Sequence, residues 1–458
     1  MWQVAWAAAL ILALAAGAGV AQDRADLSPA EARQLASTLL DAGDAAGALR
    51  VADALIQRDR GDFAAHMLRA QALQDQGRRG SARRAARTAY RLPASAEERF
   101  GAAYFLAHAL ARDGFLTHGQ LWLRRAAQTA PDEASRKAVA RDYDTFRSRN
   151  PMLFSMSASV TPSNNVNSGS NASSFRNPGI PWLPPEIEID DSQKALSGYE
   201  AQLAAHLTWR LKPSATRMTA LHLRADRTDV FLSSEAKALA PAARGSDYDR
   251  AGISLGITQK YRAEGARSVF SYGLWAGHDW SGGGNLSDTL RLTGQVERPI
   301  SDRTAFTVSG QAERQMRLDS SARNATLTGV SLGLQHRLHN SDRVNLTLGW
   351  RDTSTESPGL RNSAMTARLD WTKAKPVAGL GFEAGLGFEW RDYPDSPYDP
   401  VDGRQDRRLS LDVAVEFQKV QYMGFSPRLE ISAERNKSDV GLFDQRNMGV
   451  QLGFRSAF

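Results

Sequence analysis

The stretch that decides the fold is residues 198–212, GYEAQLAAHLTWRLK. From Tyr199 to Leu211 every odd-numbered residue is apolar, whereas Glu200, Gln202 and the later even-numbered residues are nearly all polar. Successive side chains of a β-strand point to opposite faces, so this period of two predicts a strand with one apolar and one polar face.

The same alternation recurs throughout residues 151–458, in about fourteen stretches of roughly 9 to 15 residues, the length of a tilted strand that crosses a bilayer. Their expected starts are near Leu153, Gly198, Thr216, Asp247, Arg267, Asp288, Thr304, Ala325, Arg343, Ala364, Leu380, Arg408, Phe425 and Arg446. An even number of strands suits a closed antiparallel barrel, which leaves no unpaired backbone edge in hydrocarbon. The sequence therefore predicts a transmembrane β-barrel in the outer membrane.

Side chains at the expected strand positions divide by face. Tryptophans on the apolar face are expected to form an interfacial girdle: Trp209, Trp350, Trp371 and Trp390. Charges of both signs on the other face predict a hydrated lumen without one dominant sign: Arg210, Arg337, Arg368, Glu383, Glu389, Arg391, Asp412, Glu416, Glu430 and Glu434. The alternative is a soluble all-β array, which would need a second sheet to cover each apolar face.

Residues 27–150 have a different composition, rich in Ala and Arg, and their apolar residues recur about every 3.6 positions, as in an α-helix. A small–Leu–Gly–small pattern recurs 34 residues later, and again after a short insertion near Ser95. Its members are Ala36, Leu39, Gly43 and Ala48; Ala70, Leu73, Gly77 and Ala82; and Ala107, Leu110, Gly114 and Gly119. The small residues let paired helices approach and the Gly permits the turn between them. This period resembles the tetratricopeptide repeat; an ordinary helical bundle is the alternative.

In such repeats the first helix of each pair lines the concave face. Nine residues occupy those positions and are candidates for docking a client: Arg33, Ser37, Asp41, Met67, Gln71, Gln74, Tyr104, His108 and Arg112. The same positions would equally suit plain solvated surface.

Residues 1–21 read as a secretory signal peptide. An apolar stretch from Val4 to Val20 ends in small residues, and cleavage is expected after Ala21. Met1-Trp2-Gln3 lacks the usual Lys or Arg, and an uncleaved anchor is the alternative.

Composition limits the possible chemistry. The chain of 458 residues has no cysteine, which excludes disulfides and thiolate sites. Its net charge of +7 gives no reason to invoke nucleic acid. We find no nucleophile-elbow motif or metal-spaced histidine pair, because His206, His222, His278 and His336 occur singly on separate expected strands. We therefore expect no enzyme, cofactor or metal site.

Two motifs point to a family. Phe154-Ser155 is followed by an Asn-rich opening at 161–167, TPSNNVN, and the end carries 424–429, GFSPRL, and 435–440, RNKSDV. With a helical-repeat domain before the barrel, the chain resembles the surface lipoprotein assembly modulators (Slam proteins) along nearly its whole mature length. A final alternating strand with Phe454 and Phe458 resembles the signal read by the barrel-assembly machinery.

The resemblance implies an α + β multidomain protein, with periplasmic tetratricopeptide-like repeats followed by an outer-membrane β-barrel of about fourteen strands. It implies delivery of lipoproteins or related secreted proteins from the periplasm to the cell surface. The expected partners are the client, outer-membrane lipid and the barrel-assembly machinery. The alternatives are a polysaccharide export porin with periplasmic repeats, which a count of sixteen strands would favour, and a simple diffusion porin.

Overall fold

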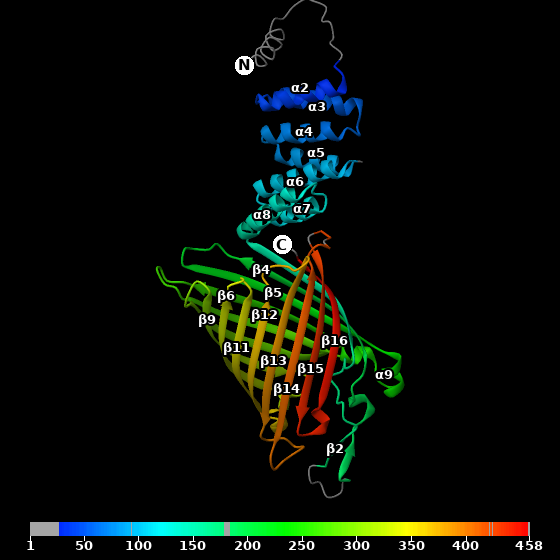
Figure 1. The fold of residues 1–458 in the computed structure, drawn as a ribbon, viewed down its shortest axis with the longest axis vertical. Helices are drawn as coiled ribbons and strands as arrows, with labels where there is room; N and C mark the ends of the chain where they lie inside the picture. Colours follow the sequence, from blue (N-terminus) through cyan, green and yellow to red (C-terminus); the bar gives the residue numbers. More distant parts are fainter. Residues whose placement is uncertain (1–26, 93, 178–183, 421, 424, 457–458) are drawn as a thin grey trace, which may run out of the picture. The chain divides into compact units, whose positions relative to one another are not determined.

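The computed structural model describes residues 27–92, 94–177, 184–420, 422–423 and 425–456 (Figure 1). The chain divides into two compact units, Met1–Asp113 and Gly114–Phe458. The expected signal peptide, residues 1–21, lies outside the described residues. The expected domain boundary at residue 150 stays a prediction.

The first unit contains α2 (Pro29–Asp41), α3 (Ala45–Arg58), α4 (Phe63–Asp75), α5 (Arg79–Arg91) and α6 (Ala96–Arg112). Two of the helix pairs that the repeat pattern predicts lie within this first unit, where α2 contacts α3 and α4 contacts α5. The second unit begins with α7 (Leu116–Gln128) and α8 (Glu133–Arg149). Gly43 separates α2 from α3 with φ +83°, and Gly77 separates α4 from α5 with φ +74°. Because L-residues rarely adopt positive φ, these turns explain why Gly recurs in the repeat.

Alanines build the core between the paired helices. Ala36, Ala48, Ala70 and Ala82 are completely buried, which confirms the small-residue positions of the repeat. Ser28 begins α2 with a capping box that includes Glu31. The helical repeats are therefore held by close backbone approach and well-formed ends.

The second unit continues as a closed barrel of fourteen strands, which confirms the predicted fold class. These are β1 (Met152–Ser163), β4 (Gly198–Arg210), β5 (Arg217–Leu232), β6 (Arg250–Tyr261), β7 (Val269–Ser281), β8 (Gly284–Pro299), β9 (Thr304–Arg317), β10 (Ala325–Arg337), β11 (Arg343–Thr355), β12 (Asn362–Thr372), β13 (Leu380–Tyr393), β14 (Arg404–Phe417), β15 (Phe425–Ser438) and β16 (Gln445–Ser456). Each pairs antiparallel with its neighbours, and β1 meets β16 to close the barrel. β14 begins before the expected Arg408, because its backbone ladder with β13 continues past the apolar alternation.

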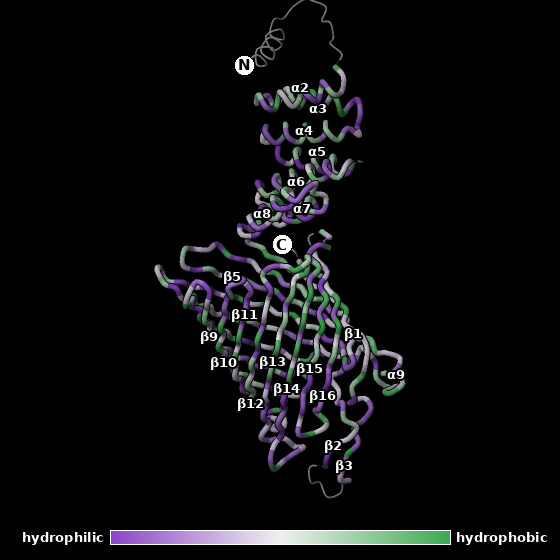
Figure 2. The backbone as a smooth tube through the Cα atoms, in the orientation of Figure 1, coloured by the Kyte–Doolittle hydropathy of each residue, from purple (hydrophilic) through white to green (hydrophobic). Residues whose placement is uncertain are grey.

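The register places apolar side chains outside and polar side chains inside. On β10, Leu332 lies opposite Val308 of β9 and Leu348 of β11, and it is 47% exposed on the outer wall. The adjacent Ser331 pairs with Ser309 on the inner wall. Hydropathy alternates along the strands in the same way (Figure 2). Large apolar side chains exposed all round a closed sheet are satisfied by lipid, so the barrel spans a membrane.

The barrel has two unlike rims. We call the rim where β1 begins and β16 ends the near rim, and the opposite one the far rim. The far rim carries the longest connections, 164–197 and 233–249, which contain the short pair β2 (Ser174–Arg176) and β3 (Glu186–Glu188) and the helix α9 (Ser234–Leu239). Val166 and Leu196 of the first connection pack on Ala236 of α9. The Asn-rich motif therefore folds against the far rim.

Candidate functional site

The candidate docking residues lie on α2, α4 and α6. These first helices of the pairs are neighbours, because α2 contacts α4 and α4 contacts α6. The structure therefore brings the three groups of predicted residues onto adjacent helices: Arg33, Ser37 and Asp41; Met67, Gln71 and Gln74; and Tyr104, His108 and Arg112. Their client-docking role stays a prediction.

Some of these side chains already have partners within the repeats. Arg33 donates to the Asp62 carboxylate at 2.9 Å, and the same carboxylate caps α4 through the Ala65 amide. The Tyr104 ring stacks edge-on against the ring of His108, with centroids 4.6 Å apart. Arg33 thus joins two repeats, whereas the Tyr104–His108 pair presents an aromatic surface on one helix.

The lumen begins with the inward-facing residues of the fourteen strands. The charged residues expected to face inward do so in the register. One of them has a more specific position. The Arg210 guanidinium donates to the Arg147 and Ser148 carbonyls at the end of α8, at 2.9 and 2.8 Å. This cation satisfies helix C-terminal carbonyls and anchors α8 at the near rim.

The wall from β11 to β14 is covered by paired charges. Glu389 accepts hydrogen bonds from Arg351 at 3.1 Å and Arg391 at 2.7 Å. Arg368 bridges Asp370 and Asp412 at 2.8 and 2.9 Å. Such networks neutralise both signs in place and leave a hydrated, internally compensated surface.

The wall from β4 to β7 is different. His206 and His222 lie on separate strands as expected, but adjacent strands bring their ring nitrogens within 3.2 Å. The Trp275 ring lies 5.1 Å from His222, and the Arg224 guanidinium lies 4.2 Å from the same indole. Gly256 faces the indole, and a Cβ at that position would lie 2.3 Å from a ring carbon. This inward tryptophan needs a glycine beside it.

We call His206, His222, Arg224 and Trp275 the lumenal aromatic cluster. Sequence reasoning did not single out Trp275. The alternation of the sequence could have predicted its inward position. Trp275 falls on the same face of β7 as Gly273 and Gly277, whereas Leu274 and Ala276 face lipid.

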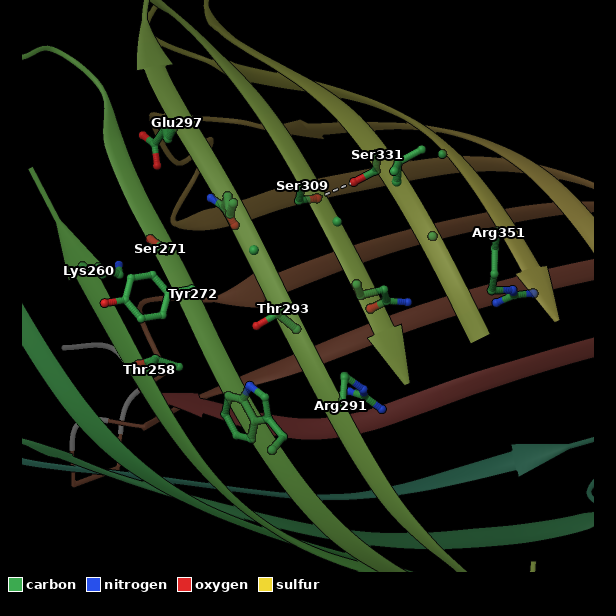
Figure 3. Close-up of a pocket in the computed structure, with 18 of the residues that line it drawn as sticks. Thr258, Lys260, Ser271, Tyr272, Arg291, Thr293, Glu297, Ser309, Ser331 and Arg351 are labelled. Carbon is green, nitrogen blue, oxygen red and sulfur yellow. Dashed lines mark hydrogen bonds between the residues drawn. The ribbon is translucent and has the colours of Figure 1, made fainter. Parts of the chain in front are cut away.

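A cavity of about 640 Å³ opens beside this cluster, along the inner faces of β6 to β11 (Figure 3). Lys260, Arg291, Glu297 and Arg351 line it together with hydroxyl and amide side chains. Arg291 is paired with Glu313, whereas Lys260 and Arg224 form no ion pair within the part of the chain that the structure describes. The cavity therefore offers cations and an aromatic face on one side of the lumen.

The other two histidines face outward. His278 shares a hydrogen bond with Asp288 at 2.6 Å, and His336 with Thr304 at 2.9 Å. Among the described residues no three His, Asp or Glu side chains are grouped to hold a metal ion. Phe454 of the expected assembly signal is exposed on the outer wall of β16, and Phe458 lies outside the described residues.

None of the helices in the described ranges is both long and apolar enough to cross a bilayer. No protein-family model and no curated protein matches the chain. An outer membrane channel from Pseudomonas putida F1 is similar at 12% identity, covering 65% of this chain and 93% of its own, with a TM-score of 0.32. OccAB3 of Acinetobacter baumannii is similar at 10% identity, covering 66% and 98%, with a TM-score of 0.35.

A further solved structure is similar over a smaller share of the chain. The type III secretion translocator chaperone SycD of Yersinia enterocolitica is similar at 16% identity, covering 30% of this chain and 97% of its own, with a TM-score of 0.25. Likenesses this distant carry no weight for function. What the residues themselves establish is a stack of helical repeats followed by a membrane-spanning barrel of fourteen strands.

Proposed function

We propose that this chain is an outer-membrane translocator that assists delivery of lipoproteins or related secreted proteins from the periplasm to the cell surface. One observation carries the proposal: a single chain joins helical repeats to a closed barrel with a polar lumen. Repeats of this kind present extended surfaces to peptides, and a barrel of fourteen strands is wider than those filled by their own side chains.

In this proposal the near rim faces the periplasm, together with the helical repeats. The client docks first on the adjacent helices α2, α4 and α6, where Tyr104 and His108 supply an aromatic surface. Outer-membrane lipid surrounds the barrel, and the barrel-assembly machinery inserts it through the final strand, β16. The chain acts as a conduit and not as an enzyme. The resemblance to the surface lipoprotein assembly modulators supports the same direction of transport.

Deletion of the chain tests the proposal. We expect labelling of intact cells to show a specific protein lost from the surface while its total cellular amount is unchanged. Re-expression of the full chain should restore it. Re-expression of a Tyr104→Ala, His108→Ala double variant that still inserts should restore less, if the aromatic surface docks the client. An unaltered surface proteome would count against translocation.

A second candidate is a solute channel, and the lumenal aromatic cluster is the observation that favours it. Arg224 and Lys260 bring positive charge to one wall, which suits entry of anions. Purified protein in planar bilayers should then conduct without a client, and Arg224→Gln should reduce anion preference while Arg368→Gln, in a paired network, should do so less. The polysaccharide export porin is disfavoured because the barrel has fourteen strands and not sixteen.

A further inference from the structure

Four cations lie next to one another on the outer wall of the barrel, toward the far-rim ends of the neighbouring strands β14, β15 and β16 (Figure 1). Arg407 lies opposite Lys437, and Arg435 lies opposite Arg446. All four are exposed, whereas Asn436, which lies between two of them on β15, is buried. We call Arg407, Arg435, Lys437 and Arg446 the outer basic patch.

The outer basic patch has no compensating negative charge among the described residues. None of its four side chains forms an ion pair or a hydrogen bond with another residue that the structure describes. The outward carboxylate of Asp392, on β13, lies opposite Gln405 and is not paired with the patch. Like charges directly opposite each other on antiparallel strands repel and destabilise the pair. An anion from outside the chain would therefore relieve both opposed pairs of the patch.

Elsewhere on the outer wall, outward cations have partners within the chain. On β5, Arg227 pairs with Asp229 at 2.6 Å. On β9, Arg314 donates to the Thr326 hydroxyl at 2.9 Å. Both cations are exposed and lie toward the far rim, as the patch does. The outer basic patch therefore differs from them in its missing partners and not in its depth along the barrel.

The patch borders the apolar part of the outer wall. Leu409, which is 53% exposed, lies directly opposite Arg435. Ile431 of β15 and Met448 of β16 continue this apolar surface toward the middle of the barrel, and they are 50% and 62% exposed. A membrane lipid can therefore place a charged headgroup on the patch and its acyl chains on these side chains. A free anion could use the cations alone.

We propose that the outer basic patch binds the headgroup of a membrane lipid that carries two phosphates, one for each opposed pair of cations. Guanidinium groups bind phosphate oxygens in a bidentate manner, and the lysine adds a point charge. Clusters of Lys and Arg at a membrane interface attract anionic lipids in the same way. The acyl chains would then lie along Leu409, Ile431 and Met448.

The position of the patch names the leaflet. In the orientation proposed above, the far rim lies in the outer leaflet, where the lipid with two phosphates is lipid A, a diphosphorylated glucosamine disaccharide. The inference rests on the proposed function for this orientation alone. It also gives a role to the motif at 435–440, because that motif supplies Arg435 and Lys437.

Lipid binding to the purified full chain tests the patch directly. Native mass spectrometry in detergent measures the affinity for diphosphorylated lipid A. An Arg435→Gln, Lys437→Gln variant removes one cation from each opposed pair, and it should bind about thirtyfold more weakly. The matched control, Arg227→Gln with Arg314→Gln, removes two outward cations from the other side of the barrel and should bind as the unsubstituted chain does. Equal affinity of the two variants would overturn the proposal.

Two further probes distinguish a lipid from a free anion. Monophosphorylated lipid A keeps the acyl chains and loses one phosphate, so it should bind about tenfold more weakly than the diphosphorylated form. Inorganic pyrophosphate keeps two phosphates and has no acyl chains, so an equal concentration should not displace the lipid. Displacement by pyrophosphate would make the patch a simple anion site and would overturn the proposal.

Thermal stability separates lipid binding from a purely structural role. Without lipid, the Arg435→Gln, Lys437→Gln variant should be at least as stable as the unsubstituted chain, because the substitutions remove repulsion between opposed cations. Diphosphorylated lipid A should then raise the unfolding midpoint of the unsubstituted chain more than that of the variant, because a ligand stabilises the state that binds it. The measurement is heat-dependent gel mobility. A lower midpoint of the variant without lipid, or an equal rise in both proteins, would overturn the proposal.

These tests are independent of the deletion experiment. If lipid binding follows the prediction but deletion of the chain changes no surface protein, the lipid site stands and the translocation proposal falls. If the variants bind lipid equally while deletion strips a protein from the surface, the lipid site falls and translocation stands.

Discussion

The helical repeats and the barrel bury their apolar residues in opposite directions. In the repeats, Ala36, Ala70 and Ala107 are completely buried between helices. In the barrel, Leu255, Leu292 and Leu452 are among the most exposed leucines, all on the outer wall. The difference teaches that exposure of apolar side chains has no fixed meaning, because water surrounds one region and lipid the other.

The largest expected effect tests the lipid-facing wall. Leu332→Arg should cost about 2–4 kcal/mol, because it moves a charge into hydrocarbon. Gln335→Arg on the same strand faces the lumen and should be mild. The measurement is the folded, inserted fraction by heat-dependent gel mobility. Equal losses at both positions would break the proposed difference between the walls.

A larger apolar side chain sharpens the comparison of packing. Ala70→Leu should destabilise the helical repeats by about 1–3 kcal/mol, because Ala70 is completely buried and its surroundings cannot expand. Ala312→Leu is the matched change on the outer wall, where Ala312 is exposed opposite Leu292, and should be neutral. Urea unfolding compares the two variants: the helical circular dichroism signal reports unfolding of the repeats, and the gel mobility of the folded form reports unfolding of the barrel. A neutral Ala70→Leu would argue against the close helix pairing.

A smaller effect separates two glycines. Gly77→Ala places a Cβ at φ +74° and should cost the repeats roughly 1–2 kcal/mol by left-handed strain. Gly294→Ala in β8 has open space around its Cβ and ordinary strand geometry, so it should be neutral or slightly stabilising. The midpoint of thermal unfolding measures both. Similar shifts would show that the turn conformation is not what selects Gly77.

The smallest expected effect is on the stability of the helical repeats at acid pH. Burial acts to raise the pKa of the Asp62 carboxyl, but the Ala65 amide and Arg33 outweigh it and hold the pKa below its usual range. A carboxyl with a lowered folded-state pKa stabilises above its unfolded value, about 3.9, and that contribution is lost as pH falls through the folded value. The helical circular dichroism signal of the Asp62→Asn variant should therefore depend less on pH below about 4 than that of the unsubstituted protein. An unchanged acid transition would contradict this, and Asp53→Asn, at a more exposed ion pair, is the control.

The period-two alternation and the repeat spacing predicted most of the strands and helices. The starts expected at Gly198, Thr304 and Leu380 are those of β4, β9 and β13. The alternation also predicted which charged residues face the lumen. A register shift of one residue would move every side chain of a strand to the opposite face, so the apolar face fixes the polar one. Alternation does not predict which inward-facing residues contact one another. Arg368 and Asp412, for example, lie on different strands, and the stagger of the strands in the barrel decides whether their side chains are close enough to pair.

By itself the sequence determined the local elements, because hydrophobic spacing, Gly turns and capping residues act over a few positions. That is why the buried alanines of the repeats and the lipid face of the barrel were readable in advance. Only the tertiary structure decided the contacts between distant strands. Trp275 of β7 lies beside Arg224 of β5, Arg210 of β4 joins the end of α8, and Asn164 joins β16 across the seam that closes the sheet. Closure is a property of all fourteen strands together, so no single stretch of sequence contains it.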